Sequence, residues 1–508
     1  MTPSFFSRGM ALGFGLLFAI TAPTGAAGGA GVSFTHGVAS GEVTPASAVV
    51  WTRVDREVVL TLEVSDTKAF TTPLTLTAAA LAANDFTAKA LVFPLKPATR
   101  YFFRWRHGNA VSDVGTFVTA PLLTRRSFRF VWSGDSDPSR IGGLPVFNNW
   151  EALDAARGEQ PDFFVYLGDT IYSDFRAGGL LPDVQTLDGF RGLYKSARDF
   201  PALQALARST SIYAIWDDHE VRNDWDGETV DPAILATGRK AFLEYMPLWD
   251  RPVLQDRDCA TAPLFRAFSW GREADLFVLD TRSCRSASVE QVCLGDLAPT
   301  MPASIRPQFG LAAQPPAGCL DAINDPSRTI LGRVQKAVFK QALLASRARF
   351  KIVITPEAIQ QLLVVPYDTW EGYTAERIEI LSFIRDQGIR NVLFLTTDGH
   401  QNVMNDVFID RFTNPAPIAY EVMTGPIASV TWQNLLLAAV GPGGVAAQQA
   451  IHGILGAQCR HLDAYSYGVV EIDAVTGTAT ISVKDATGNV LHDQVTPATA
   501  CTKTLPAS

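Results

Sequence analysis

Acidic residues follow five apolar runs of this sequence, and two of these stretches add a histidine. The stretches are Ser133-Gly134-Asp135, Gly168-Asp169-Thr170-Ile171-Tyr172, Asp217-Asp218-His219 with Asn223 close behind, Asp280-Thr281-Arg282, and Asp398-Gly399-His400. An isolated acid at such a position is more often a turn residue or a helix cap. Several carboxylates in one crevice would repel one another strongly unless cations neutralised them. The sequence therefore predicts a metal centre.

The ligand types restrict which metal this centre could hold. Carboxylates, the amide of Asn223, the phenol of Tyr172 and an imidazole form an oxygen-rich set without a thiolate, which suits ferric iron, manganese, calcium or magnesium better than zinc. Tyr172 comes three residues after Asp169, so its phenol can reach the same ion. A phenol has a pKa of about 10 and ligates well only when a strong Lewis acid removes its proton. We therefore expect ferric iron; the alternative is that Tyr172 packs beneath its own loop.

Strand-like and helical patterns alternate after Pro121, and these elements must position the acids. The strand-like runs are Phe128–Trp132, Phe163–Leu167, Ile212–Trp216, Leu276–Leu279, Phe350–Ile354 and Val392–Leu395, and the helical patterns are Val334–Ser346 and Ala375–Gln387. This alternation predicts an α/β domain whose sheet is buried on both faces. Ligands of such domains bind beyond the strand ends, where the acids lie.

Residues 32–120 show an all-β pattern instead. Ala48–Val54, Val58–Val64 and Tyr101–Arg106 are rich in β-branched and aromatic residues, and turn residues separate them. This pattern predicts a small β-sandwich. No cluster of titratable groups occurs in it, so we expect its role to be structural or substrate-guiding.

The whole chain has the composition of a globular protein with a large core. Its 508 residues predict two or more domains, and its formal charge of -8 argues against a nucleic-acid-binding or anionic-membrane-binding protein. Arg8, the apolar run Met10–Ile20 and the small residues Thr24–Ala30 resemble an export signal. The apolar run is shorter than the ~20 residues that span a bilayer. We expect a periplasmic or secreted protein without a stable membrane anchor.

The six cysteines predict disulfide bonds. None forms a CxxC pair or neighbours a histidine at metal-ligand spacing, which argues against a zinc site. Four of them fall between Cys259 and Cys319, in a stretch rich in Pro, Gly and Ser. We expect this stretch to be a surface insertion held by its own disulfides.

Several motifs, in a fixed order, resemble a known family. They are Phe34–Gly41 (FTHGVASG), Gly168–Asp174 (GDTIYSD), Trp216–Asp224 (WDDHEVRND), Asp280-Thr281-Arg282, Trp370–Arg377 (WEGYTAER) and Thr396–Asn402 (TTDGHQN). From Phe34 to about residue 485 the chain resembles the alkaline phosphatase D (PhoD-like) metallophosphatases. The resemblance implies a phosphomonoesterase or phosphodiesterase. It also implies a two-sheet αββα domain like that of purple acid phosphatases, at 121–485, after a signal peptide at 1–30 and a β-sandwich domain at 31–120, with a tail at 486–508.

The resemblance also implies roles for the matching residues. Asp135, Asp169 and Tyr172 would surround an iron ion, with Asp169 bridging to a second site that holds calcium or another divalent ion. The residues of that second site would be Asn223, Asp398 and His400, and an extended segment would turn the last two to the same side. His219 and Arg282 would bind phosphate oxygens. Asp217 and Asp218 would either ligate metal or orient His219.

Some alternatives stay open at this point. Many relatives carry a cysteine ligand where this chain has Ser133–Asp137, so Asp135 or Asp137 must serve, or fewer ligands hold the ion. Arg282 could instead pair with Asp280 or Asp218 and hold a loop. Trp370 and Tyr373 either cover the site or pack in the core. Two other functions are a phospholipase that acts on lipid phosphodiesters and a non-catalytic, calcium-stabilised binding protein. A structural calcium site has no use for the cationic Arg282 and His219, so these residues favour catalysis.

Overall fold

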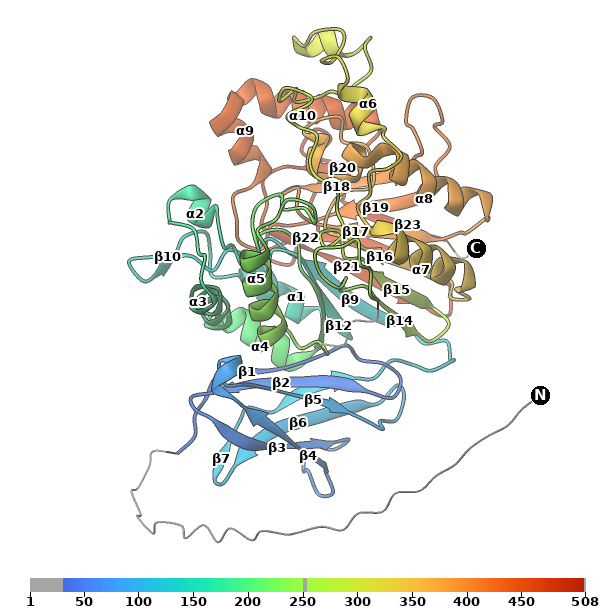
Figure 1. The fold of residues 1–508 in the computed structure, drawn as a ribbon. Helices are drawn as coiled ribbons and strands as arrows, with labels where there is room; N and C mark the ends of the chain where they lie inside the picture. The colour runs from blue at the N-terminus through green and yellow to red at the C-terminus, as the bar shows by residue number, and fades with distance from the viewer. Residues whose placement is uncertain (1–30, 250–253, 507–508) are drawn as a thin grey trace, which may run out of the picture. The chain divides into compact units, whose positions relative to one another are not determined.

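The computed structural model describes residues 31–249 and 254–506 (Figure 1). The predicted export signal, residues 1–30, lies outside the described residues. From Val32 onward the chain clusters into one unit. Within the described ranges, no helix is long and apolar enough to cross a membrane.

The first large sheet has nine strands within the described residues. In spatial order they are β23 (Thr502–Leu505), β22 (Thr478–Asp485), β21 (Ser466–Asp473), β9 (Phe128–Ser133), β12 (Phe163–Leu167), β13 (Ser211–Ile215), β1 (Phe34–Gly41), β2 (Ala48–Val54) and β5 (Thr87–Val92). The strands β9, β12 and β13 run parallel at its centre. Every residue of β12 is buried, as expected for a strand that is covered on both faces.

Strand β1 connects the N-terminal strands to the rest of this sheet. It pairs in parallel with β13, with Ser40 opposite Ser211 and Gly41 opposite Ile212. A glycine is needed here because a Cβ atom on Gly41 would collide with the backbone oxygens of Pro247 and Ile212. The first sheet therefore continues across residue 120, and the domain boundary placed there stays a prediction.

Two smaller sheets complete the first half of the chain. One contains β4 (Leu74–Ala80), β3 (Val58–Ser65), β6 (Arg100–His107), β7 (Ala110–Val111) and β8 (Gly115–Val118), and the other contains β10 (Arg140–Ile141) and β11 (Leu144–Pro145). Leu60, Leu62 and Trp105 of the former sheet are buried in the same core as Val50 of β2. These N-terminal strands thus pack as the predicted β-sandwich.

The second large sheet carries the later strands. In spatial order they are β14 (Arg266–Trp270), β15 (Ala274–Val278), β16 (Phe350–Ile354), β17 (Val392–Thr396), β19 (Ala419–Met423), β18 (Asn402–Val407) and β20 (Cys459–His461). Side chains alternate between its two faces. Leu276 and Val278 belong to the core that also contains β12, whereas Phe277 belongs to the core beneath α7 (Gly332–Ala345) and α8 (Thr374–Asp386).

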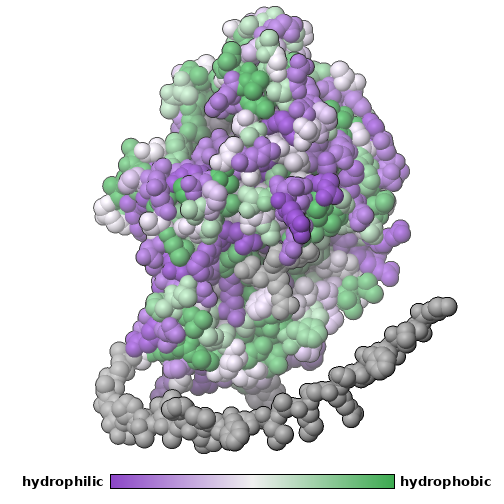
Figure 2. All heavy atoms as spheres, in the orientation of Figure 1, coloured by the Kyte–Doolittle hydropathy of each residue, from purple (hydrophilic) through white to green (hydrophobic). Residues whose placement is uncertain are grey.

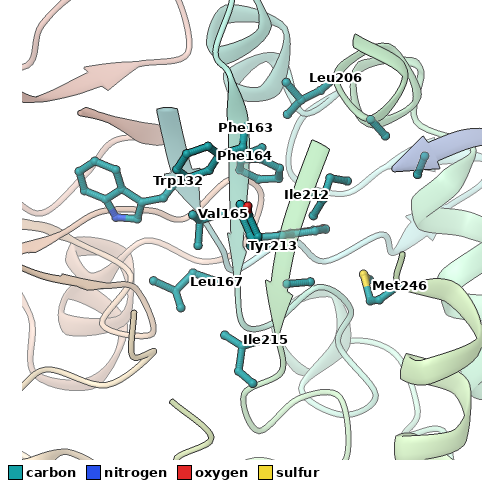
Figure 3. Close-up of a cluster of buried hydrophobic side chains, with 14 of the residues drawn as sticks. Trp132, Phe163, Phe164, Val165, Leu167, Leu206, Ile212, Tyr213, Ile215 and Met246 are labelled. Atoms are coloured by element: carbon teal, nitrogen blue, oxygen red, sulfur yellow. The ribbon is translucent and has the colours of Figure 1, made fainter. Parts of the chain in front are cut away.

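The described residues form ten helices. They are α1 (Glu151–Gly158), α2 (Arg176–Gly179), α3 (Leu187–Arg198), α4 (Pro201–Ser209), α5 (Pro232–Tyr245), α6 (Cys319–Ile323), α7 (Gly332–Ala345), α8 (Thr374–Asp386), α9 (Trp432–Val440) and α10 (Pro442–Leu455), with 3-10 turns η1 (Ala82–Asn84), η2 (Arg306–Phe309), η3 (Pro366–Asp368) and η4 (Trp370–Tyr373). Of these helices, α4 packs on the first large sheet, and α7 and α8 pack on the outer face of the second. Leu206 of α4 and Met246 after α5 pack near β12 and β13 (Figure 3). The rings of Phe163 and Trp270 lie 4.6 Å apart and join the two sheets. The predicted αββα layering is confirmed.

Three disulfides close loops of the described chain. Cys259–Cys284 and Cys293–Cys319 lie within the stretch where disulfides are predicted, and Cys459–Cys501 joins β20 to the C-terminal segment. The predicted tail at 486–508 contributes β23, which pairs with β22 at the edge of the first sheet. The prediction of disulfides is confirmed.

Candidate metal centre and active site

The loops after β9, β12, β13 and β17 meet at a pocket of about 530 Å³. Its lining residues are Asp174, Phe175, Asp183, Asp218, His219, Asn223, Asp224, Asp398, His400, Trp432 and Leu435. Asp135, Asp169 and Tyr172 are fully or almost fully buried beside it. The acids of four of the five predicted strand ends therefore converge. Asp280 does not line the pocket, and its carboxylate accepts from the backbone N–H groups of Leu264 and Ser283.

Two groups of possible metal ligands share Asp169. One ligand atom each from Asp135, Asp169 and His400 lie within 4.8 Å of one another, and so do ligand atoms from Asp169, Asp218 and His219. A carboxylate that belongs to both groups has the position that a bridging ligand needs. The placement of Asp169 therefore agrees with the bridging role that the resemblance implies.

Several of these residues have a left-handed backbone conformation. The φ angles are 57° at Asp135, 47° at Asp169, 60° at Asp398 and 50° at His400. Side chains other than glycine seldom adopt such values, and Asp, Asn and His do so more often than most. These turns end each strand abruptly. The conformation also contradicts the prediction of an extended segment from Asp398 to His400.

Two glycines leave room for the carboxylates. A Cβ atom on Gly168 would lie 2.7 Å from Cβ of Asp217, and one on Gly425 would lie 2.5 Å from Oδ2 of Asp135. Their φ angles are 74° and 115°, which other residues rarely adopt. Any larger residue at Gly425 would displace the side chain of Asp135.

The phenol of Tyr172 points at the first group of ligands. Its oxygen lies 3.0 Å from Nε2 of His400, and its ring stacks on His219 with the ring centroids 4.1 Å apart. The side chain is fully buried. Tyr172 is thus not simply packed beneath its own loop, and its oxygen is close enough to share a cation with His400.

Three carboxylates use one oxygen for support and leave the other without a donor. Asp135 Oδ1 accepts from the backbone N–H of Asp398 at 3.2 Å, Asp169 Oδ1 from that of His219 at 3.2 Å, and Asp218 Oδ2 from that of Asp224 at 2.6 Å. The second oxygen of each is buried and accepts no hydrogen bond from any described residue. Buried oxygens without donors are costly unless a cation binds them. These residues therefore fit a metal centre.

The electrostatics of the bare protein support the same conclusion. Burial raises the pKa values of Asp135 and Asp169 well above their ordinary range, and the nearby carboxylate of Asp218 adds to both shifts. Burial, with Asp169 and Asp135, likewise raises the pKa of Tyr172 well above 10. Without cations, Asp135 and Asp169 would therefore favour their protonated forms. Burial opposes the ionisation of Asp218 as well, but the charges of His219 and Arg282 lower the pKa of Asp218 below its ordinary value. Bound cations would favour the ionised forms of Asp135 and Asp169 instead.

His219 is held in one orientation beside these acids. Its Nδ1 forms a hydrogen bond of 2.6 Å with Asp174, and its Nε2 lies 4.0 Å from Oδ2 of Asp169. Burial opposes its charged form, but the carboxylates of Asp218 and Asp174 raise the pKa of His219 to about 9. In the bare protein this imidazole is therefore protonated, and it lies at the wall of the pocket.

Arg282 is enclosed by carboxylates and does not line the pocket. Its Nε donates to Asp217 at 2.6 Å, and its Nη1 and Nη2 donate to both oxygens of Asp368 at 2.7 and 2.6 Å. Glu357 lies 3.1 Å from Nε, and the guanidinium is 0% exposed. Every nitrogen of the guanidinium thus has a carboxylate partner, which favours a structural role, and the binding of phosphate oxygens by Arg282 stays a prediction. The structural alternative fits better, although its main partners are not the predicted Asp280 and Asp218.

Asn223, Asp398 and His400, the residues predicted for the second site, all line the pocket. His400 also lies with Asp135 and Asp169, whereas Asp398 belongs to no group of three acidic, histidine or cysteine ligands among the described residues. Their role as one site stays a prediction. His400 is turned toward the first group because its φ is positive and its Nδ1 bonds to the carbonyl of Val430 at 2.5 Å. A further acidic group, Asp218, Asp224 and Asp368, lies next to the second group. The group that includes Cys259 and Cys284 offers no thiolate, because these cysteines form a disulfide.

Two other open alternatives are now decided by contacts. Asp137 accepts from the backbone N–H groups of Ser139 at 2.8 Å and Ala177 at 2.6 Å, so it holds a loop, and Asp135 is the acid that faces the centre. Trp370 and Tyr373 are buried in the core that also contains α7 and α8. They do not line the pocket and therefore do not cover the site.

Sequence reasoning missed several residues at the site. Asp174 orients His219, and Glu220 accepts from the backbone N–H groups of Thr170 at 2.6 Å and Asp217 at 2.9 Å. Asp174 lies in the GDTIYSD motif and Glu220 in the WDDHEVRND motif, so the sequence contains a signal that points to both residues. Trp432 has no such signal, because only the folded chain brings α9 to the pocket.

Comparison with known proteins places the fold and the motifs in context. Residues 139–483 match the family described as PhoD-like phosphatase, and residues 20–121 match the N-terminal domain of PhoD-like phosphatases. Alkaline phosphatase D of Bacillus subtilis (strain 168) is 24% identical over 419 residues, which are 74% of this chain and 66% of that protein. The match thus spans slightly less than two thirds of the relative.

A solved structure of PhoD has the same fold. It superposes with a TM-score of 0.73 and 20% sequence identity, over 94% of this chain and 90% of that chain. The match therefore extends over nearly the whole chain.

Proposed function

This chain belongs to the PhoD-like phosphatase family, and from that premise we propose that it is a metal-dependent phosphoester hydrolase. The observation that carries this proposal is the set of buried carboxylate oxygens without donors on Asp135, Asp169 and Asp218, next to the oriented imidazole of His219. A purely structural cluster would have satisfied these oxygens with N–H or O–H groups.

We propose two adjacent cation sites that share Asp169. Asp135, Tyr172 and His400 would complete the first, with ferric iron as the ion that suits a phenol ligand. Asp218, with Asp398 and Asn223 from the pocket wall, would complete the second, with calcium or another divalent ion. Bound metal ions would acidify a water molecule and neutralise charge on the phosphate group.

The protein residues contribute orientation and proton transfer. Asp174 fixes the ring of His219 so that Nε2 faces the interior of the site, where it would donate to the departing oxygen of the substrate. Glu220 holds the loops that carry Thr170 and Asp217, and so keeps the ends of β12 and β13 together. Burial of the ligands excludes bulk water from the carboxylates.

We propose that the substrate is a small phosphomonoester or phosphodiester and that the protein works outside the cytoplasm. The described disulfides support export, because such bonds persist in oxidising compartments. The pocket volume of about 530 Å³ is large enough for a small phosphoester.

The test is hydrolysis of one phosphomonoester and one phosphodiester by the purified protein, before and after chelation. The proposal expects turnover of at least one of them, loss of turnover on metal removal, and recovery when metal returns. Iron bound by Tyr172 should also give a visible phenolate-to-iron band that Tyr172→Phe removes. A protein that binds calcium but hydrolyses neither substrate would support the non-catalytic alternative, and a fully active protein without metal would contradict the proposal.

A further inference from the structure

The helices α9 and α10 form a charge-free hairpin at the mouth of the pocket. The sequence contains no Asp, Glu, Lys or Arg between Glu421 and Arg460. Trp432 and Leu435, at the start of α9, line the pocket. Beyond them the hairpin extends outward, so an uncharged surface borders an acidic site.

The outer part of this hairpin is exposed as well as apolar. No residue of α9 is fully buried, and Leu437 and Val440 are 41% and 56% exposed. The buried residues of α10 lie near its C-terminal end, at Gln448, Ile451, His452 and Leu455. The hairpin is thus anchored at its base, and its tip has no protein to cover it among the described residues.

A second segment adds exposed apolar side chains to the same mouth. Phe175 lines the pocket and is 41% exposed, and Leu180 at the end of α2 is 74% exposed. The α2 turn lies against the chain that leads to α9, since a Cβ atom on Gly178 would lie 3.2 Å from Cγ2 of Val430. We call Phe175, Leu180, Leu437 and Val440 the apolar rim.

The pictures agree with this placement. Figure 1 shows α2 and α9 along the same side of the molecule. Figure 2 shows hydrophobic residues at the upper edge of that side, where α9 and α10 lie in Figure 1. An exposed apolar patch beside a pocket is typical of a surface that meets a ligand, a partner protein or a membrane.

The composition of the rim decides between these occupants. Protein interfaces combine an apolar centre with a polar border, and they favour aromatic and arginine anchors. The exposed tip of the hairpin offers leucine, valine, alanine, proline and glycine, without a charged residue. The chain carries a net charge of -8, so attraction to anionic lipids cannot supply the binding. Phe175 is the aromatic residue of the rim, and the hairpin tip adds no aromatic or arginine anchor. An uncharged apolar tip of this kind matches the apolar interior of a bilayer better than a protein interface.

We propose that the apolar rim inserts into the surface of a lipid bilayer and presents the mouth of the pocket to it. The helices have 9 and 14 residues, which is too short to span and long enough to lie in the interface. Insertion into the bilayer does not depend on catalysis. The purpose of insertion, which is to bring the site to phosphoesters at a lipid surface, rests on the proposed function.

The test is flotation of the purified full chain with vesicles of zwitterionic phosphatidylcholine. The rim variant is Leu437→Asp with Val440→Asp, two residues that do not line the pocket. The control is Leu294→Asp with Val475→Asp, at residues that are 81% and 93% exposed and distant in sequence from the rim. All three proteins share the N-terminal apolar run, so any binding by that run is common to them.

We expect the wild type and the control to bind the vesicles equally, at low and at high salt. The rim variant should bind at least about tenfold more weakly, since each leucine or valine that leaves the bilayer removes about a factor of ten or more. Turnover of a soluble phosphoester should be equal in all three, which shows that the variants are folded. If none hydrolyses a soluble phosphoester, the proposed function fails while the binding result still stands.

Three results would overturn the proposal. The wild type could fail to bind, the rim variant could bind as well as the wild type, or binding could vanish in high salt. Sedimentation of the same proteins without lipid measures their oligomeric state and so tests whether a second copy of this chain covers the rim. If the wild type is a dimer, the rim variant a monomer, and vesicle binding is the same in both, the rim is an interface with a second copy of this chain.

Discussion

At the residue scale, each carboxylate of the centre uses its two oxygens differently. One oxygen of Asp135, Asp169 and Asp218 is fixed by a backbone N–H group, and the other accepts from no donor among the described residues. The fixed oxygen determines the direction of the free one. This division explains how a cluster of acids can be rigid and still be open to a cation.

The proposed acid role of His219 predicts a dependence on the leaving group. His219→Asn should slow hydrolysis of an alkyl phosphoester by roughly 10²–10⁴-fold, because the departing alkoxide needs a proton. Hydrolysis of a nitrophenyl phosphoester should slow much less, since nitrophenolate is a stable anion and leaves without a proton. Asp174→Asn should show the same pattern with a smaller loss. Equal losses for both substrates would indicate that His219 only binds the phosphate group.

His452 predicts a pH dependence of stability that is separate from the metal centre. Burial, with the nearby Arg460, lowers the pKa of this side chain to about 4 from an ordinary value of 6.5. Below pH 6.5 the unfolded chain binds the proton and the folded chain does not, so stability falls as pH falls toward 4. Between pH 7 and 5 the loss should be roughly 2 kcal/mol. Thermal unfolding of His452→Gln should show a correspondingly weaker decline over this range, and an unchanged decline would refute the assignment.

At the element scale, Arg282 links the end of β15 to the loops that carry Asp217 and Asp368. Arg282→Ala would leave several buried carboxylates without their cation, which typically costs about 3–5 kcal/mol. We expect a lower melting temperature, and Arg282→Lys should restore only part of it, because an ammonium cannot reproduce the forked contacts. Inhibition by inorganic phosphate should be unchanged in any folded variant. Weaker phosphate binding at an unchanged melting temperature would restore the role of a phosphate clamp.

Gly425 tests the dependence of the centre on the chain after β19. Gly425→Ala would bring a Cβ atom within 2.5 Å of Oδ2 of Asp135 and would also strain a backbone with φ of 115°. We expect a loss of bound iron together with a loss of activity. The control is Gly443→Ala, where a Cβ atom meets nothing within 4 Å, in the hairpin. Full metal content in a folded Gly425→Ala protein would show that Asp135 is not a ligand.

The sequence was sufficient to predict the positions of the strands, but it predicted the geometry of the site only in part. Runs such as Phe163–Leu167 are apolar throughout because both faces of the sheet are covered, so their positions could be predicted. The acids follow these runs directly and were found with them. The left-handed turn at His400 and the enclosure of Arg282 depend on partners far along the chain, such as Val430 and Asp368. No local sequence pattern predicts such contacts.

At the scale of the whole molecule, the two large sheets bring the ends of β9, β12, β13 and β17 to one place. Strand β1 joins the N-terminal strands to the sheet whose strands β9 and β12 precede Asp135 and Asp169. The N-terminal segment therefore supports the framework of the site. That pairing could not be read from the sequence, because it rests on a close approach at Gly41. The metal centre depends on this framework as a whole.

Elemental analysis of purified protein tests the central claim most directly. The wild type should carry iron together with calcium or another divalent ion. Asp169→Asn should lose most of both metals, because the carboxylate of Asp169 belongs to both ligand groups. Its turnover should fall roughly 10²-fold or more, because the lost charge stabilisation raises the activation barrier by several kcal/mol. Asp137→Asn is the matched control, a buried acid near Asp135 whose oxygens are bound by backbone N–H groups, and it should keep its metals. A folded Asp169→Asn protein with full metal content and near-native turnover would contradict the account.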